Sequence, residues 1–277
     1  MKCFVTGAAG FIGSHLVDEL IKQGHIVYGI DNFLTGDKAN VNEKCHFYER
    51  DIREVTAEEL QDIDAIFHLA AVARTQWCID DPLLAHEINA TGTLNMLLKA
   101  REAGVKRFIY SSSCIVYVPT TPYYISKMMA EEYVRIFHDL YGMSTLSLRY
   151  SNVYGSLRQS EKGPAINCIA SLRKTKKETG KVWLTGDGSQ TRDFIHVEDI
   201  VRANILAANS QVTGFLDICT GKQTSMKTIA DYFNCSIEFV EARQGDVKHL
   251  VQNPDPAWEK LGFTYLKELR DHIQVYL

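Results

Sequence analysis

Short apolar runs alternate with amphipathic stretches through the first half of the chain. The apolar runs have the length of buried strands, and the stretches between them repeat apolar residues at intervals of three and four, as one helix face does. The predicted strands are Lys2–Thr6, Ile26–Asp31, His46–Arg50, Ala65–Ala70 and Phe108–Ser112, and the predicted helices are Phe11–Gln23, Pro82–Ala103 and Pro122–Tyr141. This alternation predicts an α/β fold with a doubly wound parallel sheet, which a further strand at Thr145–Tyr150 would complete.

The pattern changes after Tyr150, where segments become shorter and glycines more frequent. We expect one main domain over residues 1–150 and a smaller α/β lobe over most of 151–277. The strands predicted in this second part are Val182–Leu184, Phe215–Cys219 and Ile237–Val240. One helix, Val197–Ala208, is expected to return to the main sheet.

Composition and charge narrow the class of protein. Acidic and basic residues are mixed, with a formal net charge of −4, which argues against a nucleic-acid binder. The basic run Arg173–Lys177 is expected to be a solvated helix face. Apolar windows stay below the roughly 20 residues that span a bilayer, and the chain opens directly on a strand, so we expect neither a membrane segment nor a secretory leader. Seven scattered cysteines are typical of reduced thiols in a cytoplasm, and the histidines have no ligand spacing, so no metal is expected.

Three glycines follow the first predicted strand at intervals of three. Gly7 would permit a tight turn, Gly10 would let the backbone approach a pyrophosphate, and Gly13 would let helix and strand pack closely. The backbone N–H groups at the helix start then form an anion site. Asp31 lies 18 residues past Gly13, at the end of the second strand. A carboxylate there can accept hydrogen bonds from an adenosine ribose and would repel a 2′-phosphate, so the loop predicts NAD rather than NADP.

A serine, a tyrosine and a lysine form the candidate reactive group. Ser113 follows the fifth strand, at the edge where doubly wound sheets bind ligands. Thr121 is a good helix N-cap and Pro122 suits the first helical position, so Tyr123 and Lys127 should lie one turn apart on one face. A nearby ammonium and a positive nicotinamide ring would favour the tyrosine phenolate, and the serine hydroxyl could hold the substrate oxygen as its proton leaves.

Taken together, these motifs resemble the extended short-chain dehydrogenase/reductase family, and within it the nucleotide-sugar epimerase/dehydratase group. The resemblance covers almost the whole chain and implies a Rossmann-type fold. It is carried by Thr6–His15, Asp31-Asn32, Asp51-Ile52, His68–Ala71, Asn89–Thr93, Ser111–Ser113, Pro122–Lys127, Arg149–Gly155, Gly186–Val197, Arg243 and Asp246.

The resemblance also implies roles for individual residues. Together with the glycine loop, it gives a cofactor-binding set of Gly7, Gly10, Phe11, Ile12, Gly13, Asp31, Asn32, Asp51, Ile52, Leu69, Ala70, Ala71, Ser111, Tyr123, Lys127 and Tyr150. The implied substrate contacts are Ser113, Asn152, Arg192, Arg243 and Asp246, with the two arginines on a nucleoside diphosphate and Asp246 on its ribose. Two arginine forks would offset the charge of a pyrophosphate. Asn89 is expected to tie a helix to the backbone and is left out of the site.

The residues after the serine indicate which reaction to expect. Dehydrating relatives resemble one another in carrying an Asp-Glu pair there, and decarboxylating relatives typically carry a Glu, whereas this chain has Cys114 and Ile115. A cysteine serves as a base in some relatives, but Cys114 falls one residue early, and one step along a strand end reverses the side chain. We therefore expect a buried thiol and a 4-epimerase, with UDP-sugars favoured. Tyr123 would remove the 4-hydroxyl proton while hydride passes to NAD, and the 4-keto sugar would turn over before hydride returns.

One segment departs from the family pattern. Only nine residues separate Ser113 from Tyr123, where the family has a much longer segment, and Val118 stands where a glycine is expected. Ten extended residues still reach about 33 Å, so the catalytic group can assemble, with a more open pocket. This leaves two alternatives: a nucleotide-sugar reductase or dehydrogenase of the same fold that releases its cofactor, and a non-catalytic NAD sensor.

A homodimer is also expected from the resemblance. The predicted helices at Pro82–Ala103 and Pro122–Tyr141 correspond to those that pair two family members. Met128, Met129, Tyr133 and Phe137 could supply apolar contacts there, and core packing explains some of them equally well.

Overall fold

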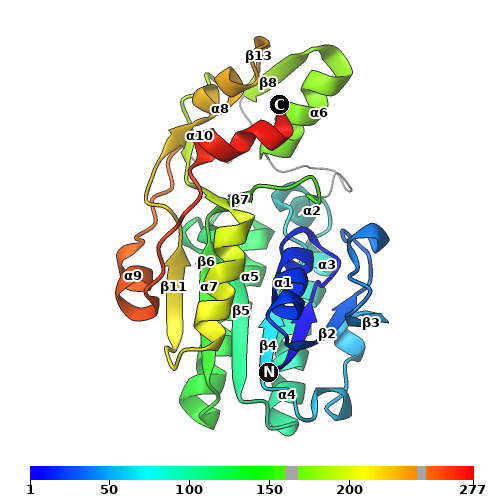
Figure 1. Cartoon of the computed structure of the whole chain (residues 1–277). Helices are drawn as coiled ribbons and strands as arrows, with labels where there is room; N and C mark the ends of the chain where they lie inside the picture. Colours follow the sequence, from blue (N-terminus) through cyan, green and yellow to red (C-terminus); the bar gives the residue numbers. More distant parts are fainter. Residues whose placement is uncertain (160–167, 242–247) are drawn as a thin grey trace.

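A seven-stranded sheet forms the centre of the computed structural model, which describes residues 1–159, 168–241 and 248–277 (Figure 1). Its order is β11-β6-β5-β4-β1-β2-β3, and every neighbouring pair is parallel. The strands are β1 Lys2–Thr6, β2 Ile26–Asp31, β3 His46–Glu49, β4 Ala65–His68, β5 Arg107–Ser113, β6 Thr145–Tyr150 and β11 Gly214–Ile218. The predicted α/β, doubly wound fold is confirmed.

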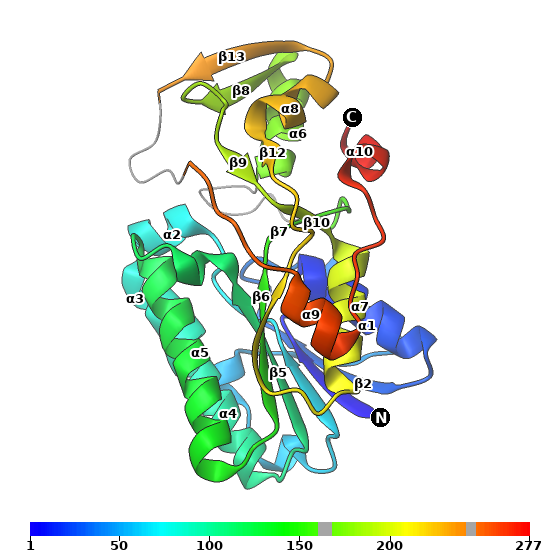
Figure 2. The same cartoon turned by 90° about the vertical axis from the view of Figure 1, so that its left-hand side faces the viewer.

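Helices cover both faces of this sheet. Alternate residues of a strand point to opposite faces, so Cys3 and Val5 join one apolar core while Phe4 joins the other. The first core includes residues of α1 (Phe11–Lys22) and α7 (Val197–Ala208), and the second includes residues of α4 (Thr93–Glu102) and α5 (Pro122–Tyr141). Figure 2 shows these two pairs of helices on opposite sides of the strands.

The bounds of the predicted helices agree closely with those in the structure, except that one predicted helix is interrupted. In α5, the Thr121 hydroxyl accepts a hydrogen bond from Tyr124 N at 3.2 Å, and Gly142 ends the helix with a left-handed φ of 68°. The predicted helix at Pro82–Ala103 is instead divided into α3 (Pro82–His86), a π-helical turn at Glu87–Gly92, and α4. Nothing in the sequence pattern indicated the π-helical turn.

One strand lies elsewhere than expected. The predicted strand Phe215–Cys219 was placed in the smaller lobe, but β11 pairs with β6 and is the edge strand of the main sheet. Leu216 and Ile218 are buried in the same core as α7, and α9 (Asp255–Leu261) packs on this strand. Apolar alternation identifies a half-buried strand but does not say which sheet it joins.

The remaining elements form a smaller unit above the carboxyl ends of the main strands (Figure 2). Three two-stranded sheets form it together with α6 (Cys168–Thr179), α8 (Met226–Tyr232) and α10 (Leu269–His272). The pairs are β7 (Asn152–Tyr154) with β10 (Phe194–His196), β8 (Lys181–Thr185) with β13 (Ser236–Val240), and β9 (Thr191–Arg192) with β12 (Thr224–Ser225). Its core contains Tyr154, Leu172, Val182 and Phe233. The division into cofactor and substrate domains stays a proposal.

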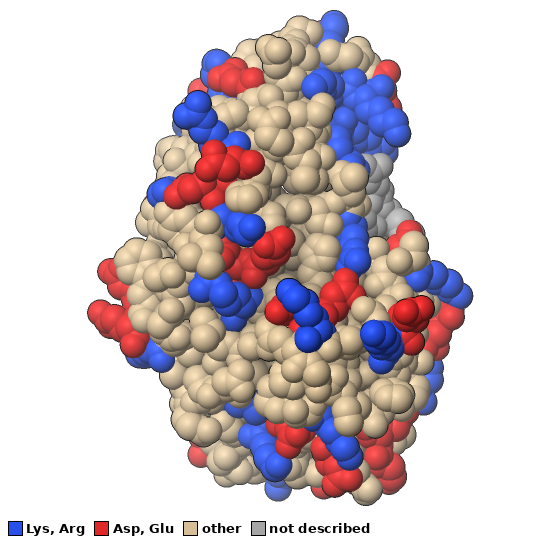
Figure 3. All heavy atoms as spheres, in the orientation of Figure 1, with Lys and Arg blue, Asp and Glu red and all other residues tan. Residues whose placement is uncertain are grey.

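The predicted basic run does lie on a helix. Arg173, Lys174, Lys176 and Lys177 belong to α6, whose buried residues are Ile169, Ala170 and Leu172. Figure 3 shows a cluster of Lys and Arg side chains over this helix, while acidic and basic groups are mixed across the rest of that face.

Arg107 on β5 joins three elements of the main domain. Its guanidinium donates to Ala207 O at 3.2 Å, Val212 O at 2.6 Å and Ser144 Oγ at 2.8 Å, and the residue is buried. We predict that Arg107→Met lowers the free energy of unfolding by about 2–3 kcal/mol, because buried carbonyls lose their donors. Urea denaturation measures the change.

The neighbouring residue gives a matched control. Lys106 forms a surface ion pair with Asp64 at 2.8 Å, and its side chain is 77% exposed. Exposed ion pairs contribute little to stability, so Lys106→Met should change the urea midpoint far less than Arg107→Met. Equal effects of the two variants would contradict this role of Arg107.

Candidate active site

A cavity of about 580 Å³ lies where the strands of the main sheet end and the smaller unit begins. Every predicted site residue that the structure describes lines it. These are Gly7, Gly10, Phe11, Ile12, Gly13, Asp31, Asn32, Asp51, Ile52, Leu69, Ala70, Ala71, Ser111, Ser113, Tyr123, Lys127, Tyr150, Asn152 and Arg192. Arg243 and Asp246 lie outside the described residues.

The glycine loop is shaped by contacts that leave no room for side chains. Gly7 has a φ of +67°, and a Cβ there would lie 3.0 Å from Ala70 N. A Cβ on Gly13 would lie only 2.0 Å from Gly7 O. The chain therefore turns tightly enough for α1 to begin against β1, with its N-terminal N–H groups at the cavity. Such a cradle fits a pyrophosphate.

A buried histidine fixes the opposite side of the loop. His68 Nδ1 lies 2.8 Å from Thr6 Oγ1, and His68 Nε2 lies 2.9 Å from Thr93 Oγ1. The Thr6 hydroxyl also accepts hydrogen bonds from Leu69 N and Ala70 N, both at 3.0 Å. Burial lowers the pKa of His68 to about 3, so the ring is neutral. Sequence reasoning noted His68 only as part of a motif and missed this network.

Asp31 and Asp51 lie at the end of the cavity formed by β2 and β3. Asp31 is buried, and its carboxylate accepts from Ala9 N at 3.0 Å and Phe33 N at 2.8 Å, so it also holds the glycine loop. Asp51 accepts from Asn32 Nδ2 at 3.1 Å and Arg53 N at 2.9 Å. Burial acts to raise the pKa of Asp51, but hydrogen bonds from Arg53 outweigh it, and the pKa is lowered.

Asn89 does tie a helix to the backbone. Its side chain accepts from Val72 N at 2.7 Å and donates to Val72 O at 3.1 Å and Ser126 Oγ at 3.0 Å. The π-helical turn that contains Asn89 therefore fixes the segment after β4 against α5, next to Tyr123.

Burial governs the charge of the reactive tyrosine and lysine. It raises the pKa of Tyr123 well above 10, although a hydrogen bond with the Ser113 hydroxyl and the charge of Arg74 act to lower it. It lowers the pKa of Lys127 to about 7. Lys127 Nζ donates to Ser111 O at 2.6 Å and lies 4.5 Å from the centre of the Tyr110 ring. Burial thus shifts both groups toward their neutral forms, and Lys127 can gain or lose its proton near neutral pH.

Cys114 lines the cavity, which differs from the expected buried thiol. We assumed that it continues the strand, but β5 ends at Ser113, and Cys114–Tyr117 is a 3-10 turn. The inference that the Cys114 side chain points away from the site assumed strand geometry, so it does not apply here. Burial nevertheless raises the pKa of the Cys114 thiol to about 12, so it keeps its proton at neutral pH.

A chain of polar side chains, buried except at the exposed Tyr117, supports this short turn. Ser112 Oγ donates to Glu131, which forms an ion pair with Arg149, and Arg149 Nη1 donates to Tyr117 OH at 2.7 Å. The Tyr117 hydroxyl in turn donates to Asp217 at 2.9 Å. The end of β5, α5, β6 and β11 are thereby linked beneath Ser113. No sequence motif indicated this chain, because its members come from five separate elements.

The predicted substrate residues lie where the two parts of the molecule meet. Asn152 begins β7 and donates to Asp193 O at 3.2 Å, and Arg192 on β9 donates to Thr191 O at 2.8 Å. Tyr150 ends β6, and its hydroxyl bonds to Asn204 on α7 at 2.9 Å. The tyrosine hydroxyl is therefore fixed from the side of the main sheet.

Arg74 is a cavity residue that sequence reasoning missed. It immediately precedes α2 (Thr75–Asp80), is buried, and lines the cavity with Tyr123. The signal available in the sequence was a lone arginine after the His68–Ala71 motif, which does not reveal its closeness to Tyr123, 49 residues later.

Within the described residues, no helix combines the length and apolarity needed to cross a membrane. The same part of the chain holds no group of three or more His, Cys, Asp or Glu side chains arranged for a metal ion. The seven cysteines, all of them described, form no disulfide.

The fold and the site define a class of protein. A parallel doubly wound sheet, a glycine cradle at its first helix, a carboxylate after its second strand, and a Tyr-x-x-x-Lys pair in the same cavity are the features of a Rossmann-type NAD-dependent enzyme. Comparisons with known proteins identify the family within this class.

Residues 3–214 match the NAD dependent epimerase/dehydratase family, to which this chain therefore belongs. The UDP-glucose 4-epimerase of Mycolicibacterium smegmatis is 32% identical over 294 residues, which cover 95% of this chain and 93% of that protein. The structure of UDP-glucose 4-epimerase from Thermotoga maritima with UDP-glucose has a TM-score of 0.93 at 32% identity, covering 100% of this chain and 97% of that one. UDP-glucuronic acid 4-epimerase from Bacillus cereus, with UDP-glucuronic acid and NAD, has a TM-score of 0.91 at 27% identity, covering 100% and 98%.

The low pKa of Lys127 predicts a pH-dependent stability. In the unfolded chain the amine keeps its proton to about pH 10.4, whereas burial lowers its pKa to about 7 in the fold. Folding therefore releases a proton between these values, and Lys127 destabilises the fold more as the pH falls from 10 toward 7. Urea unfolding of the NAD-free proteins measures this effect. The free energy of unfolding of Lys127→Met, relative to wild type, should be about 2 kcal/mol higher at pH 7 than at pH 9.

Lys44 supplies the control for this measurement, because its side chain is exposed. The difference between Lys44→Met and wild type should be the same at both pH values. If the Lys127→Met difference is equally constant, Lys127 does not lose its proton on folding.

Proposed function

We propose that this protein is an NAD-dependent 4-epimerase of nucleotide sugars, with UDP-sugars as the favoured substrates. The observation that carries the proposal is that Ser113, Tyr123 and Lys127 line one cavity with the glycine loop. The family relationship supports the reaction class, and the similarity to UDP-sugar 4-epimerases supports the choice of substrate.

The residues at the first helix fit NAD. A side chain at Gly7 or Gly13 would collide with neighbouring backbone, so the tight turn that begins α1 at the cavity requires glycine at both positions. Asp31 lines the same cavity as this turn, and its carboxylate is suited to the adenosine ribose. When bound, NAD supplies a hydride acceptor and donor for carbon 4 of the sugar. The same dinucleotide serves both half-reactions, so no net redox change accompanies turnover.

Tyr123 is assigned the proton transfer. Its phenol would take the proton of the sugar 4-hydroxyl in one half-reaction and return it in the other. Because burial raises the pKa of this phenol, ionisation depends on positive charge supplied at the site. Lys127, one helical turn away, is assigned to the nicotinamide ribose, and the Ser113 hydroxyl to the 4-oxygen of the sugar.

The nucleotide of the substrate is assigned to the smaller unit. Arg192 and Asn152 line the cavity at its boundary with that unit. An arginine fork there can bind a pyrophosphate oxygen pair. Arg243 and Asp246, outside the described residues, are assigned to the same nucleotide by their motif.

The cavity wall favours epimerisation over elimination. Asp31 and Asp51, at the opposite end from Tyr123, are the carboxylates among its described lining residues. Dehydration needs an additional acid and base beside the sugar. Cys114 does not supply that base, because its thiol keeps its proton at neutral pH. This leaves the minimal set of Ser113, Tyr123 and Lys127 that 4-epimerisation requires.

The direct test is activity of the purified protein without added cofactor. Wild type should retain NAD through gel filtration and interconvert a pair of 4-epimers when incubated with UDP-, GDP-, CDP- and dTDP-sugars, with the products resolved by NMR. Tyr123→Phe should lower kcat about 1,000-fold, because the proton has no acceptor. Tyr124→Phe is the matched control and should keep wild-type activity.

Full activity of Tyr123→Phe would contradict the mechanism. Consumption of added NADH in proportion to product would instead identify a reductase. NAD binding without turnover of any sugar in the panel would identify a sensor.

We also propose that the protein forms a homodimer through α5. Ile125, Met129 and Leu140 are exposed at helical spacing along α5, and Leu83 of the neighbouring α3 is exposed as well. Phe137, one of the predicted interface residues, belongs instead to the core. Met128 and Tyr133 are half-buried and lie at the edge of the exposed stripe.

Sedimentation velocity tests the dimer. Wild type should sediment as a dimer, and Met129→Glu should shift it to a monomer, because a buried charge opposes the helix pairing. Leu266→Glu, at an exposed leucine of the C-terminal segment, is the control and should leave the dimer intact. A monomeric wild type at micromolar concentration would contradict the proposal.

A further inference from the structure

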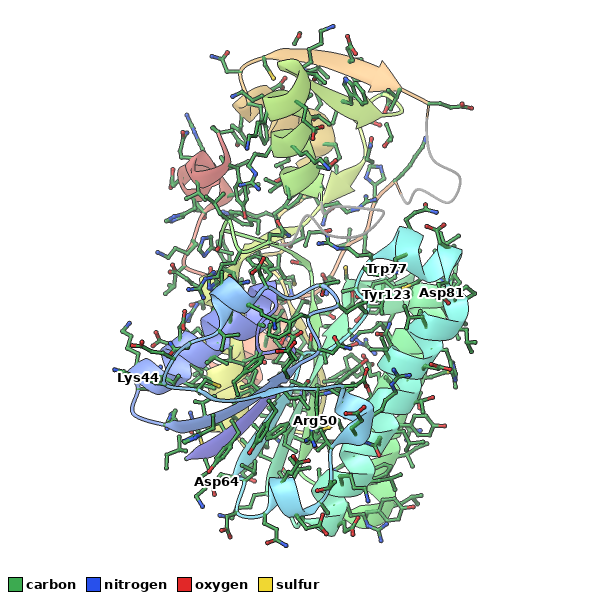
Figure 4. All side chains as sticks on the ribbon, turned by 90° about the vertical axis from the view of Figure 1, so that its right-hand side faces the viewer. Lys44, Arg50, Asp64, Trp77, Asp81 and Tyr123 are labelled. Carbon is green, nitrogen blue, oxygen red and sulfur yellow. The ribbon has the colours of Figure 1, made fainter. Side chains whose placement is uncertain are left out.

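Three buried polar side chains follow one another along α5. Tyr123, Lys127 and Glu131 are spaced four residues apart, so they lie one above the other on the helix face that packs against β5 and β6. None of the three is more than 9% exposed. Figure 4 shows Tyr123 at the start of this helix, beside Trp77 of α2. Tyr123 and Lys127 are assigned to the reaction, and Glu131 lies one turn further along.

Lys127 and Glu131 attach α5 to two successive residues of β5. Lys127 Nζ donates to Ser111 O at 2.6 Å, and Ser112 Oγ donates to the Glu131 carboxylate. The next residue of the strand is Ser113, whose hydroxyl is assigned to the 4-oxygen of the sugar. The end of the strand is therefore fixed to the helix at two points directly before this serine.

A buried cation holds the Glu131 carboxylate from the other side. Arg149 on β6 forms an ion pair with Glu131, and its Nε donates to Glu131 Oε1 at 3.0 Å. Arg149 is buried, and its guanidinium lies 3.5 Å from the centre of the Phe215 ring. A buried ion pair adds little net stability over apolar residues of similar size. Its position one turn from Lys127 therefore points to a role in the reactive site.

Titratable groups face Lys127 from four elements. They are Tyr123 and Glu131 on α5, Tyr110 on β5, His68 on β4 and Cys78 on α2. Burial raises the pKa of Cys78 to about 11 and the pKa of both tyrosines above 10, and it lowers the pKa of His68 to about 3. These four groups are therefore neutral near pH 7, and Glu131 is the negative charge among the five. Burial lowers the pKa of Lys127 to about 7, and the charge of Glu131 acts in the opposite direction.

We propose that Glu131 is a positioning residue for the proton transfer at Tyr123. Through Ser112 it fixes the end of β5, and with it the Ser113 hydroxyl. Its negative charge keeps the Lys127 side chain in the ammonium form. An ammonium beside the phenol favours the phenolate, so the charge of Glu131 acts on Tyr123 through Lys127. This inference rests on the proposed function, which assigns the transferred proton to Tyr123.

The first test is the pH profile of kcat, measured on the NAD-containing protein with the panel sugar that wild type epimerises fastest. Because the reaction needs the ammonium, kcat should fall as the pH rises and Lys127 loses its proton. Glu131→Gln keeps the size of the side chain and an acceptor oxygen but not the charge, so this fall should occur at a pH about one unit lower. Glu132→Gln removes an exposed carboxylate paired with Arg135, and this matched control should keep the wild-type profile.

The second test needs no substrate. In NAD-free protein labelled with 13C-lysine, NMR follows the titration of the Lys127 side chain, whose signal is identified by its loss in Lys127→Met. The midpoint should lie at about pH 7 in wild type and in Glu132→Gln, and about one unit lower in Glu131→Gln. Ser112→Ala leaves the carboxylate in place and should keep the wild-type midpoint. The same variant should lower kcat about 10-fold, because Ser113 is held less precisely.

The outcomes separate this inference from the function on which it rests. Equal Lys127 midpoints in wild type and Glu131→Gln would overturn the electrostatic role, even if kcat falls by the same factor at every pH. A wild-type kcat in Ser112→Ala would overturn the positioning role, and this variant removes only one hydroxyl, so it remains decisive if Glu131→Gln fails to fold. A protein that shows the shifted midpoint but turns over no nucleotide sugar would contradict the proposed function and leave the coupling of Glu131 to Lys127 standing.

Discussion

The site depends on how closely the backbone after β1 approaches the backbone after β4, at the carboxyl ends of these two neighbouring strands. Gly7 lies against Leu69 and Ala70, and no side chain fits between them. The Thr6 hydroxyl, itself bonded to the neutral His68, fixes the same two residues by their N–H groups. The glycine loop and the end of β4 therefore form one rigid surface. This contact shapes the glycine cradle for the cofactor. It also directs the first turn of α1 toward the cavity.

At the other end of the cavity, burial sets the chemistry. It raises the pKa of Tyr123 and lowers that of Lys127, so in the protein without ligands both groups are shifted toward their neutral forms. In the proposed mechanism, the pair transfers a proton only when positive charge is supplied nearby. The hydrogen-bonded chain from Ser112 through Glu131 and Arg149 to Tyr117 holds the short turn after β5 in place.

The sequence predicted most of the main sheet because parallel strands buried on both faces read as apolar runs. It predicted helix α5 because Thr121 and Pro122 mark its start and apolar residues recur along one face. The candidate cofactor and reactive residues were predicted from their spacing and from the family resemblance, and those that the structure describes line one cavity. Other features depend on contacts between distant segments. Tertiary packing determines which strand β11 pairs with. A 3-10 turn determines that the Cys114 side chain faces the cavity, and the packing of α2 against α5 brings Arg74 to the same cavity. No local pattern encodes these three.

The central claim is that hydride leaves carbon 4 of a nucleotide sugar and returns to the same carbon within one cavity. Substrate labelled with deuterium at carbon 4 tests this directly, with NMR and mass spectrometry of the product. The account predicts that the 4-epimer keeps its deuterium at carbon 4, and that no label enters solvent or added NADH. Loss of the deuterium to water or to free cofactor would contradict it.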